Sequence, residues 1–133
     1  MTTEHKIEQM IMLSLRPWNG NGKNTHVTSL NDVHKKPIED HSFVGICLFA
    51  DNITSTAKTV AFTSEIQQAA MNSDTGIPML ISADQESGSI YRIGTSTHTS
   101  GNMSLGAMGD PKLVRKMGEE TYRSASSLLM FMR

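Results

Sequence analysis

The chain has 133 residues, a formal net charge of −1 and 38% hydrophobic residues, which suffices for one domain with a core. Its lysines and arginines are scattered, which argues against a nucleic-acid partner and against electrostatic attraction to a membrane. The single cysteine, Cys47, cannot form a disulfide within the chain, and its apolar neighbours predict a small buried side chain.

No stretch approaches the roughly 20 apolar residues of a membrane span. Glu4, His5 and Lys6 precede a helical rather than a signal-like pattern, so we expect a cytoplasmic protein, with an extracellular one as the alternative. The histidines show no metal-ligand spacing. We therefore expect no metal or other cofactor, and expect His34 and His41 to be solvated.

The first half of the chain predicts a helix, a polar loop and a buried strand. Thr2 or Thr3 caps the helix, in which Ile7, Met10, Ile11 and Ser14 follow helical spacing. Residues 16–29 are rich in Asn and Gly and predict the loop. The apolar run at residues 43–50 predicts the strand.

The second half predicts a helix, a strand, a long loop and a last helix. Thr54 or Ser55 caps the first of these helices, which places Phe62, Ile66, Ala69 and Ala70 on one face. Five of the seven residues in 77–83 are apolar without strict alternation, which predicts a strand buried on both faces, as in a parallel sheet. A loop follows at residues 86–109, and Asp110-Pro111 begins the last helix. This order implies parallel strands with right-handed crossovers.

Two acidic residues, Asp84 and Glu86, follow the strand at residues 77–83 directly, and a small-residue turn then leads to Arg92. A desolvated carboxylate costs several kcal/mol unless it is paired. The ends of barrel strands are also where barrel enzymes gather their polar groups. The pattern alone therefore leaves two interpretations open, solvated turn acids and a binding site.

Four segments together resemble the N-terminal part of a glycoside hydrolase family 3 enzyme of the bacterial β-N-acetylhexosaminidase branch. They are MTTEHKIEQMIMLSL (1–15), VGICLFADN (44–52), IPMLISADQESGSIYRIG (77–94) and THTSGNMSLGAMGD (97–110). The resemblance implies an α/β fold in which residues 1–133 form about two to three β/α units of a TIM (β/α)8 barrel. A whole barrel takes about 250 residues, so we expect the barrel to be incomplete in this chain.

The chain also departs from the family pattern. Ser87 replaces the first of two glycines, Val44 stands before Gly45, and Pro37 falls inside a segment, 32–41, that resembles a helix. A proline inside a helix costs about 3 kcal/mol. The tail at residues 128–133 differs from the family and suggests a non-native or truncated end. We interpret the chain as a divergent copy.

The resemblance implies retaining hydrolysis of terminal β-linked N-acetylglucosamine from cell-wall or chitin-type oligosaccharides. The implied nucleophile and acid/base lie beyond the C-terminus, so we expect no catalytic residue here and no activity of the chain alone. Asp84 and Arg92 resemble substrate-binding residues, and Glu86 and Gly88 are candidates for loop support. Arg92 as a loop salt bridge to Asp84 or Glu86 is the alternative.

A different class of function also stays open, a non-catalytic remnant or a carbohydrate-binding or interaction module. An unrelated flavodoxin-like domain is disfavoured, because no Gly-rich phosphate-binding turn follows either strand. Carbohydrate is the expected partner. Self-association is also expected, because open strand edges expose unpaired backbone groups.

Overall fold

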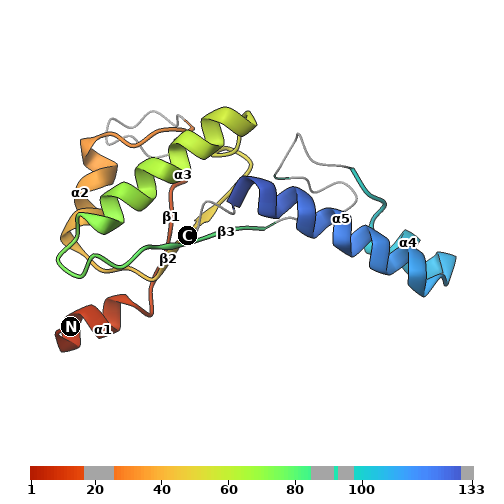
Figure 1. Cartoon of the computed structure of the whole chain (residues 1–133), viewed down its shortest axis with the longest axis horizontal. Helices are drawn as coiled ribbons and strands as arrows, with labels where there is room; N and C mark the ends of the chain where they lie inside the picture. The colour runs from red at the N-terminus through yellow and green to blue at the C-terminus, as the bar shows by residue number, and fades with distance from the viewer. Residues whose placement is uncertain (17–25, 85–91, 93–97, 130–133) are drawn as a thin grey trace.

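A computed structural model describes residues 1–16, 26–84, 92 and 98–129 of the chain. Figure 1 shows the elements in these ranges, which are α1 (Thr3–Glu8), β1 (Met12–Ser14), α2 (Asp32–Asp40), β2 (Gly45–Leu48), α3 (Thr56–Met71), β3 (Leu80–Ala83), α4 (Asn102–Met108) and α5 (Pro111–Leu129). The strands form a parallel sheet in the order β1-β2-β3. The predicted α/β fold, a parallel part of a barrel, is confirmed.

The first helix is shorter than predicted. Thr2 caps it as expected, since its hydroxyl accepts the His5 N–H at 3.1 Å, but the helix ends at Glu8. Residues 12–14 form strand β1 instead, which pairs with β2. Met10, expected within the helix, lies beyond its end and is 83% exposed. Apolar residues 10–13 suit a helix or a strand equally, and pairing with β2 decides between them.

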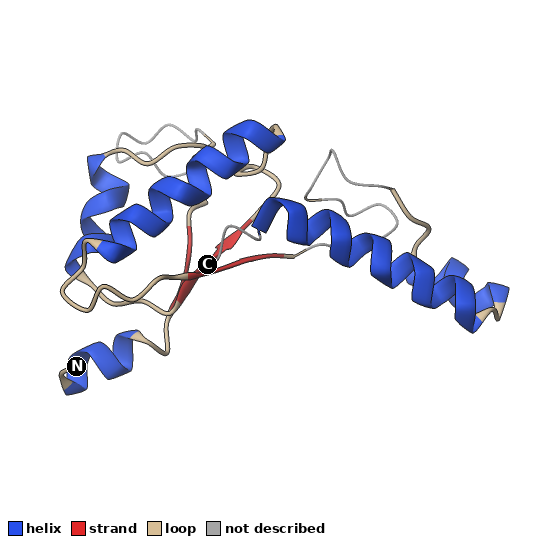
Figure 2. Cartoon of the chain, in the orientation of Figure 1, coloured by secondary structure: helices blue, strands red, loops and turns tan. Residues whose placement is uncertain are grey.

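One face of the sheet carries the core. The middle row across the three strands, Leu13, Ile46 and Ile81, belongs to or packs against the hydrophobic core. These side chains pack with the predicted buried face of α3, which is Phe62, Ile66, Ala69 and Ala70. Helices α2 and α3 lie beside the sheet (Figure 2). Ser55 caps α3 through the Lys58 N–H, as expected. The helices thus cover the sheet from one side, as in a barrel wall.

The opposite face of the sheet is much less covered. Met12 is 46% and Leu80 53% exposed, and the row Ser14, Cys47 and Ser82 lies on the same side. The prediction of a strand buried on both faces is therefore wrong for the described chain, and β3 begins at Leu80 rather than Ile77. In a closed barrel this face lies inside, and no described helix or strand fills that space.

Two further differences concern single elements. Helix α4 lies in the region predicted as a loop, because Gly106 inside it and the capping residues Gly101 and Gly109 are typical of loops in a sequence. His34, expected to be solvated, is 6% exposed on α2, and its backbone N–H bonds to the capping side chain of Asn31. Helix α5 begins as predicted, since Asp110 Oδ1 accepts the N–H groups of Lys112 and Leu113.

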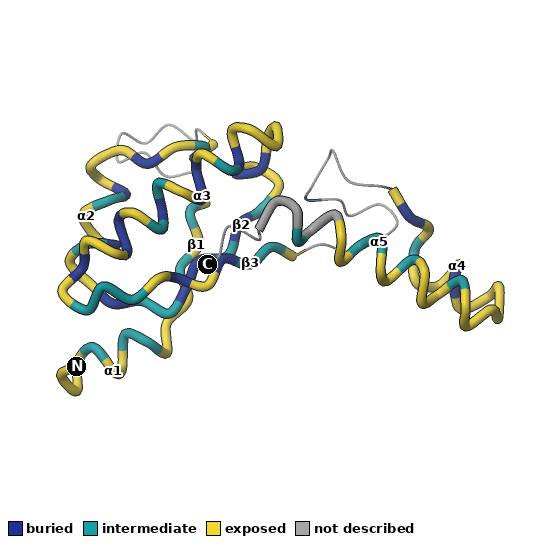
Figure 3. Tube along the Cα trace, in the orientation of Figure 1, coloured by how far each residue is buried: buried dark blue, intermediate teal, exposed yellow. Residues whose placement is uncertain are grey.

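Helix α4 and the N-terminal part of α5 lie away from the sheet and are mostly exposed, and α5 contacts α3 farther along. The buried residues gather between the sheet, α2 and α3 (Figure 3). None of the described helices is long and apolar enough to span a membrane. The predicted loop at 16–29 is described only at residues 16 and 26–29, where Val27 is buried in the core. Residues 130–133 of the predicted tail lie outside the described ranges.

Candidate functional site at the strand ends

The C-terminal ends of the three parallel strands lie at one edge of the sheet. Side chains alternate between the faces of a strand, so residues two positions apart share a face. Ser14, Cys47 and Ser82 form the last fully paired row on the face away from the helices. Two residues further along each chain segment stand Arg16, Phe49 and Asp84. The pleat therefore directs three side chains of different chemistry to one edge.

The structure brings these residues together with Arg92, and we call the four the strand-end cluster. The Arg16 guanidinium carbon lies 4.3 Å from the centroid of the Phe49 ring, and that of Arg92 lies 5.8 Å from the same centroid. Both distances fall within the range of cation–π attraction. Arg92 Nη2 lies 3.8 Å from Asp84 Oδ2.

The ion pair between Arg92 and Asp84 is loose. Its 3.8 Å separation exceeds a hydrogen bond, and the side chains are 28% and 49% exposed. Exposed pairs of this kind contribute about 0–1 kcal/mol to folding. This contact leaves the Asp84 oxygens able to accept hydrogen bonds from hydroxyl groups of a ligand. The strand-end cluster is therefore better suited to binding a polar molecule than to stabilising the fold.

Asp84 lies at the end of a strand as predicted, although the strand is the third rather than the second. Arg92 lies beside it, which agrees both with joint ligand binding and with the alternative of a salt bridge. Glu86 and Gly88, the candidates for loop support, lie outside the described residues. Arg16 and Phe49 were not predicted, because residues 12–14 were assigned to a helix. Both lie two residues beyond the row Ser14, Cys47 and Ser82, but that row is known only once the pairing of β1 with β2 is known.

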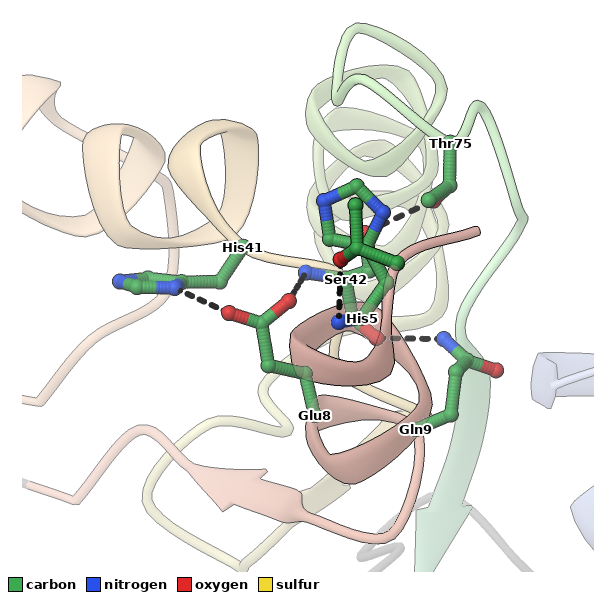
Figure 4. A network of polar contacts seen from close by, with 7 residues as sticks. His5, Glu8, Gln9, His41, Ser42 and Thr75 are labelled. Atoms are coloured by element: carbon green, nitrogen blue, oxygen red, sulfur yellow. Dashed lines mark hydrogen bonds and ion pairs between the residues drawn. The ribbon is translucent and has the colours of Figure 1, made fainter.

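A second polar cluster lies at the other end of the sheet (Figure 4). Glu8 Oε1 lies 2.7 Å from His41 Nδ1, and Glu8 Oε2 accepts the Ser42 N–H at 2.9 Å. The hydrogen bond with His41, followed by that from Ser42, holds the pKa of Glu8 below its usual range. Gln9 Nε2 also donates to the Ser42 carbonyl oxygen. These contacts tie α1 to the segment before β2, so the cluster is structural. His41, expected to be solvated, is exposed but holds this contact.

Among the described residues, no group of three or more His, Cys, Asp or Glu side chains is placed to hold a metal ion. The chemistry of the strand-end cluster is hydrogen bonding by one carboxylate and two guanidinium groups around an aromatic ring. Such a set can orient a neutral molecule rich in hydroxyl groups.

Comparison with known proteins places this arrangement in a family. The chain is 34% identical over 115 residues to beta-hexosaminidase A of Pseudoalteromonas piscicida, which covers 80% of this chain and 19% of that protein. It is 27% identical over 129 residues to probable beta-glucosidase C of Aspergillus oryzae, covering 90% and 19%. The chain thus spans about a fifth of the length of these curated relatives.

Solved structures agree. A glycoside hydrolase family 3 beta-N-acetylglucosaminidase from Paenibacillus sp. str. FPU-7 superposes with a TM-score of 0.73 at 32% identity, covering 95% of this chain and 23% of that one. NagZ from Neisseria gonorrhoeae, at 21% identity and a TM-score of 0.58, shares the fold over 77% of this chain and 26% of its own. The sequence profile of the glycosyl hydrolase family 3 N terminal domain matches residues 2–129. The chain therefore belongs to glycosyl hydrolase family 3 and forms part of its N-terminal barrel domain.

Proposed function

We propose that this chain, within a complete family 3 barrel, serves the hydrolysis of terminal β-linked N-acetylhexosamine, with N-acetylglucosamine as the sugar. The observation that carries the proposal is the meeting of Asp84 and Arg92 at the C-terminal ends of parallel strands. That edge is where barrel enzymes build their active sites. The hexosaminidase and N-acetylglucosaminidase relatives favour an N-acetylated sugar over glucose.

The two residues grip the sugar in complementary ways. The Asp84 carboxylate accepts hydrogen bonds from two ring hydroxyl groups, and the planar Arg92 guanidinium donates to ring oxygens from a rigid fork. Retaining hydrolysis also needs a nucleophile and an acid/base group about 5 Å apart. The strand-end cluster has Asp84 as its one carboxylate, so those two groups come from elsewhere in the barrel. The isolated 133-residue chain is accordingly expected to show no turnover of a chromogenic β-N-acetylglucosaminide.

The decisive test replaces Asp84 in the chain completed with the remaining barrel. Asp84→Ala removes a charged hydrogen-bonding group worth about 1.5–3 kcal/mol, which is roughly a 10- to 150-fold loss in kcat/KM. The free energy of unfolding should change little, because the ion pair is loose. Activity is measured on chromogenic β-N-acetylglucosaminide and β-glucoside, and the first should be the better substrate.

Asp40→Ala is the matched control. Asp40 pairs with Lys36 at 2.7 Å on α2, and its side chain is 49% exposed, as is that of Asp84. It should leave kcat/KM unchanged. A loss of stability in Asp84→Ala with full kcat/KM per folded molecule would show that Asp84 is structural and that the proposed grip is wrong.

A further inference from the structure

One buried amide connects the elements that carry the strand-end cluster. Asn52 is 1% exposed, and its Nδ2 donates to the Leu15 carbonyl oxygen at 2.7 Å and to that of Val27 at 2.9 Å. Its Oδ1 accepts the Phe49 N–H at 2.9 Å. Both amide hydrogens and one oxygen lone pair are therefore used, each by a main-chain group.

These three bonds fix two strand ends relative to each other. Leu15 follows β1 directly and precedes Arg16, whereas Phe49 follows β2 directly. The Asn52 side chain thus bridges the backbone beside the Arg16 guanidinium and the backbone that bears the Phe49 ring. Across this bridge the guanidinium carbon lies 4.3 Å from the ring centroid.

The position of the Phe49 ring also affects Arg92. Two guanidinium groups repel each other, and here both approach a single ring, at 4.3 and 5.8 Å. The negative face of the ring offsets part of that repulsion only while the ring keeps its place. A displaced Phe49 would leave Arg92 without this contact and would weaken its placement 3.8 Å from Asp84.

We propose that Asn52 is a positioning residue for the sugar-binding edge. Its side-chain bonds hold the backbone next to Arg16 and at Phe49 in place, so that the Arg16 guanidinium stays against the Phe49 ring. The inference rests on the proposed function for its ligand, N-acetylglucosamine, but its geometric part does not. Among the amino acids, asparagine has the shortest side chain that carries two hydrogen-bond donors and an acceptor. Aspartate would set a second acceptor against two carbonyl oxygens, and leucine would remove all three bonds to the main chain.

A purely structural role for Asn52 would lower stability without changing the site, so a matched amide is needed. Gln67 on α3 also bonds the main chain, since its Nε2 donates to the Met79 carbonyl oxygen at 2.7 Å and its Oε1 accepts the Met79 N–H at 3.0 Å. Met79 precedes β3, at the opposite end of the sheet from the cluster. Gln67→Ala therefore removes comparable bonds away from the site.

The experiment compares the 133-residue chain with its Asn52→Ala and Gln67→Ala variants by NMR. In the parent chain the Phe49 ring current should shift the Arg16 δ-methylene and Nε–Hε signals upfield. Asn52→Ala should abolish this shift and raise the Kd for N-acetylglucosamine about tenfold, which corresponds to about 1.4 kcal/mol. Gln67→Ala should be destabilised yet keep the shift, with a Kd within about twofold of the parent, a change below 0.5 kcal/mol.

Retention of the Arg16 shift in a folded Asn52→Ala chain would overturn the proposal. If that variant does not fold, Phe49→Leu tests the later step of the argument, from the ring to Arg92 and the sugar, because it removes the ring while the main-chain bonds of Asn52 stay. It must then displace the Arg92 signals and weaken sugar binding, and unchanged affinity would refute the role. If neither the parent chain nor the chain completed with the remaining barrel binds the sugar, but the arginine shifts depend on Asn52, the proposed function fails while the positioning role stands.

Discussion

Gly45, at the start of β2, gives a prediction that tests the register of the sheet. A Cβ at this position would lie 2.3 Å from the Leu80 carbonyl oxygen and 3.0 Å from the Leu80 Cβ. Real Cβ atoms essentially never approach within 3.0 Å, so in Gly45→Ala the paired strands β2 and β3 must move apart by about 1 Å. Overpacking of this kind costs about 1–3 kcal/mol.

For a chain of this length, 1 kcal/mol shifts Tm by about 4 °C, so Gly45→Ala should unfold roughly 4–12 °C below the parent. Circular dichroism during heating measures this directly. Gly118→Ala is the control, because its Cβ would meet no atom within 4 Å and alanine favours the middle of α5 by up to about 1 kcal/mol. A Gly45→Ala chain that melts at the parental temperature would show that β2 and β3 do not approach as described.

Three further outcomes are expected. The pKa of Glu8 is lowered in the folded chain, so the ionised Glu8 side chain stabilises the fold above its unfolded pKa, and this stabilisation is lost as pH falls through the folded pKa. Glu8→Gln should therefore lower Tm at pH 7 but not near pH 2. Glu4→Gln, at an exposed position, is the control. Pro37→Ala should raise the free energy of unfolding by up to about 3 kcal/mol, because it restores an N–H donor for the Val33 carbonyl inside α2, and an unchanged urea midpoint would contradict this. The isolated chain should self-associate through the edges of β1 and β3, so a single monomer boundary in sedimentation velocity would argue against open edges.

The fold was predictable where local chemistry and pattern agreed. Ser55 and Asp110 begin α3 and α5 because side-chain oxygens next to apolar periodic runs satisfy free N–H groups. Strand β1 was not predictable in this way. Its residues pair with Gly45–Cys47, about thirty positions away, and a short apolar run does not indicate which distant segment it will pair with.

The candidate site was predictable in part for the same reason. Asp84 could be found because a charge directly after an apolar strand is locally conspicuous. Arg16, Phe49 and Asn52 could not, since their contacts join the ends of different strands. An arginine in a polar loop and an asparagine in a turn are ordinary in a sequence. Asn52 stands out only because the structure buries its side-chain amide.

The partly covered face of the sheet provides a natural attachment point for a probe. Cys47 is the single cysteine of the chain, and its half-buried thiol stands between Ser14 and Ser82 in the middle of that face. A maleimide fluorophore would therefore attach at one known position without any engineered substitution. Its emission would shift to the blue when the remaining barrel strands, or a second copy of the chain, cover the face. Barrel completion could thus be timed as an assembly reaction in a stopped-flow instrument.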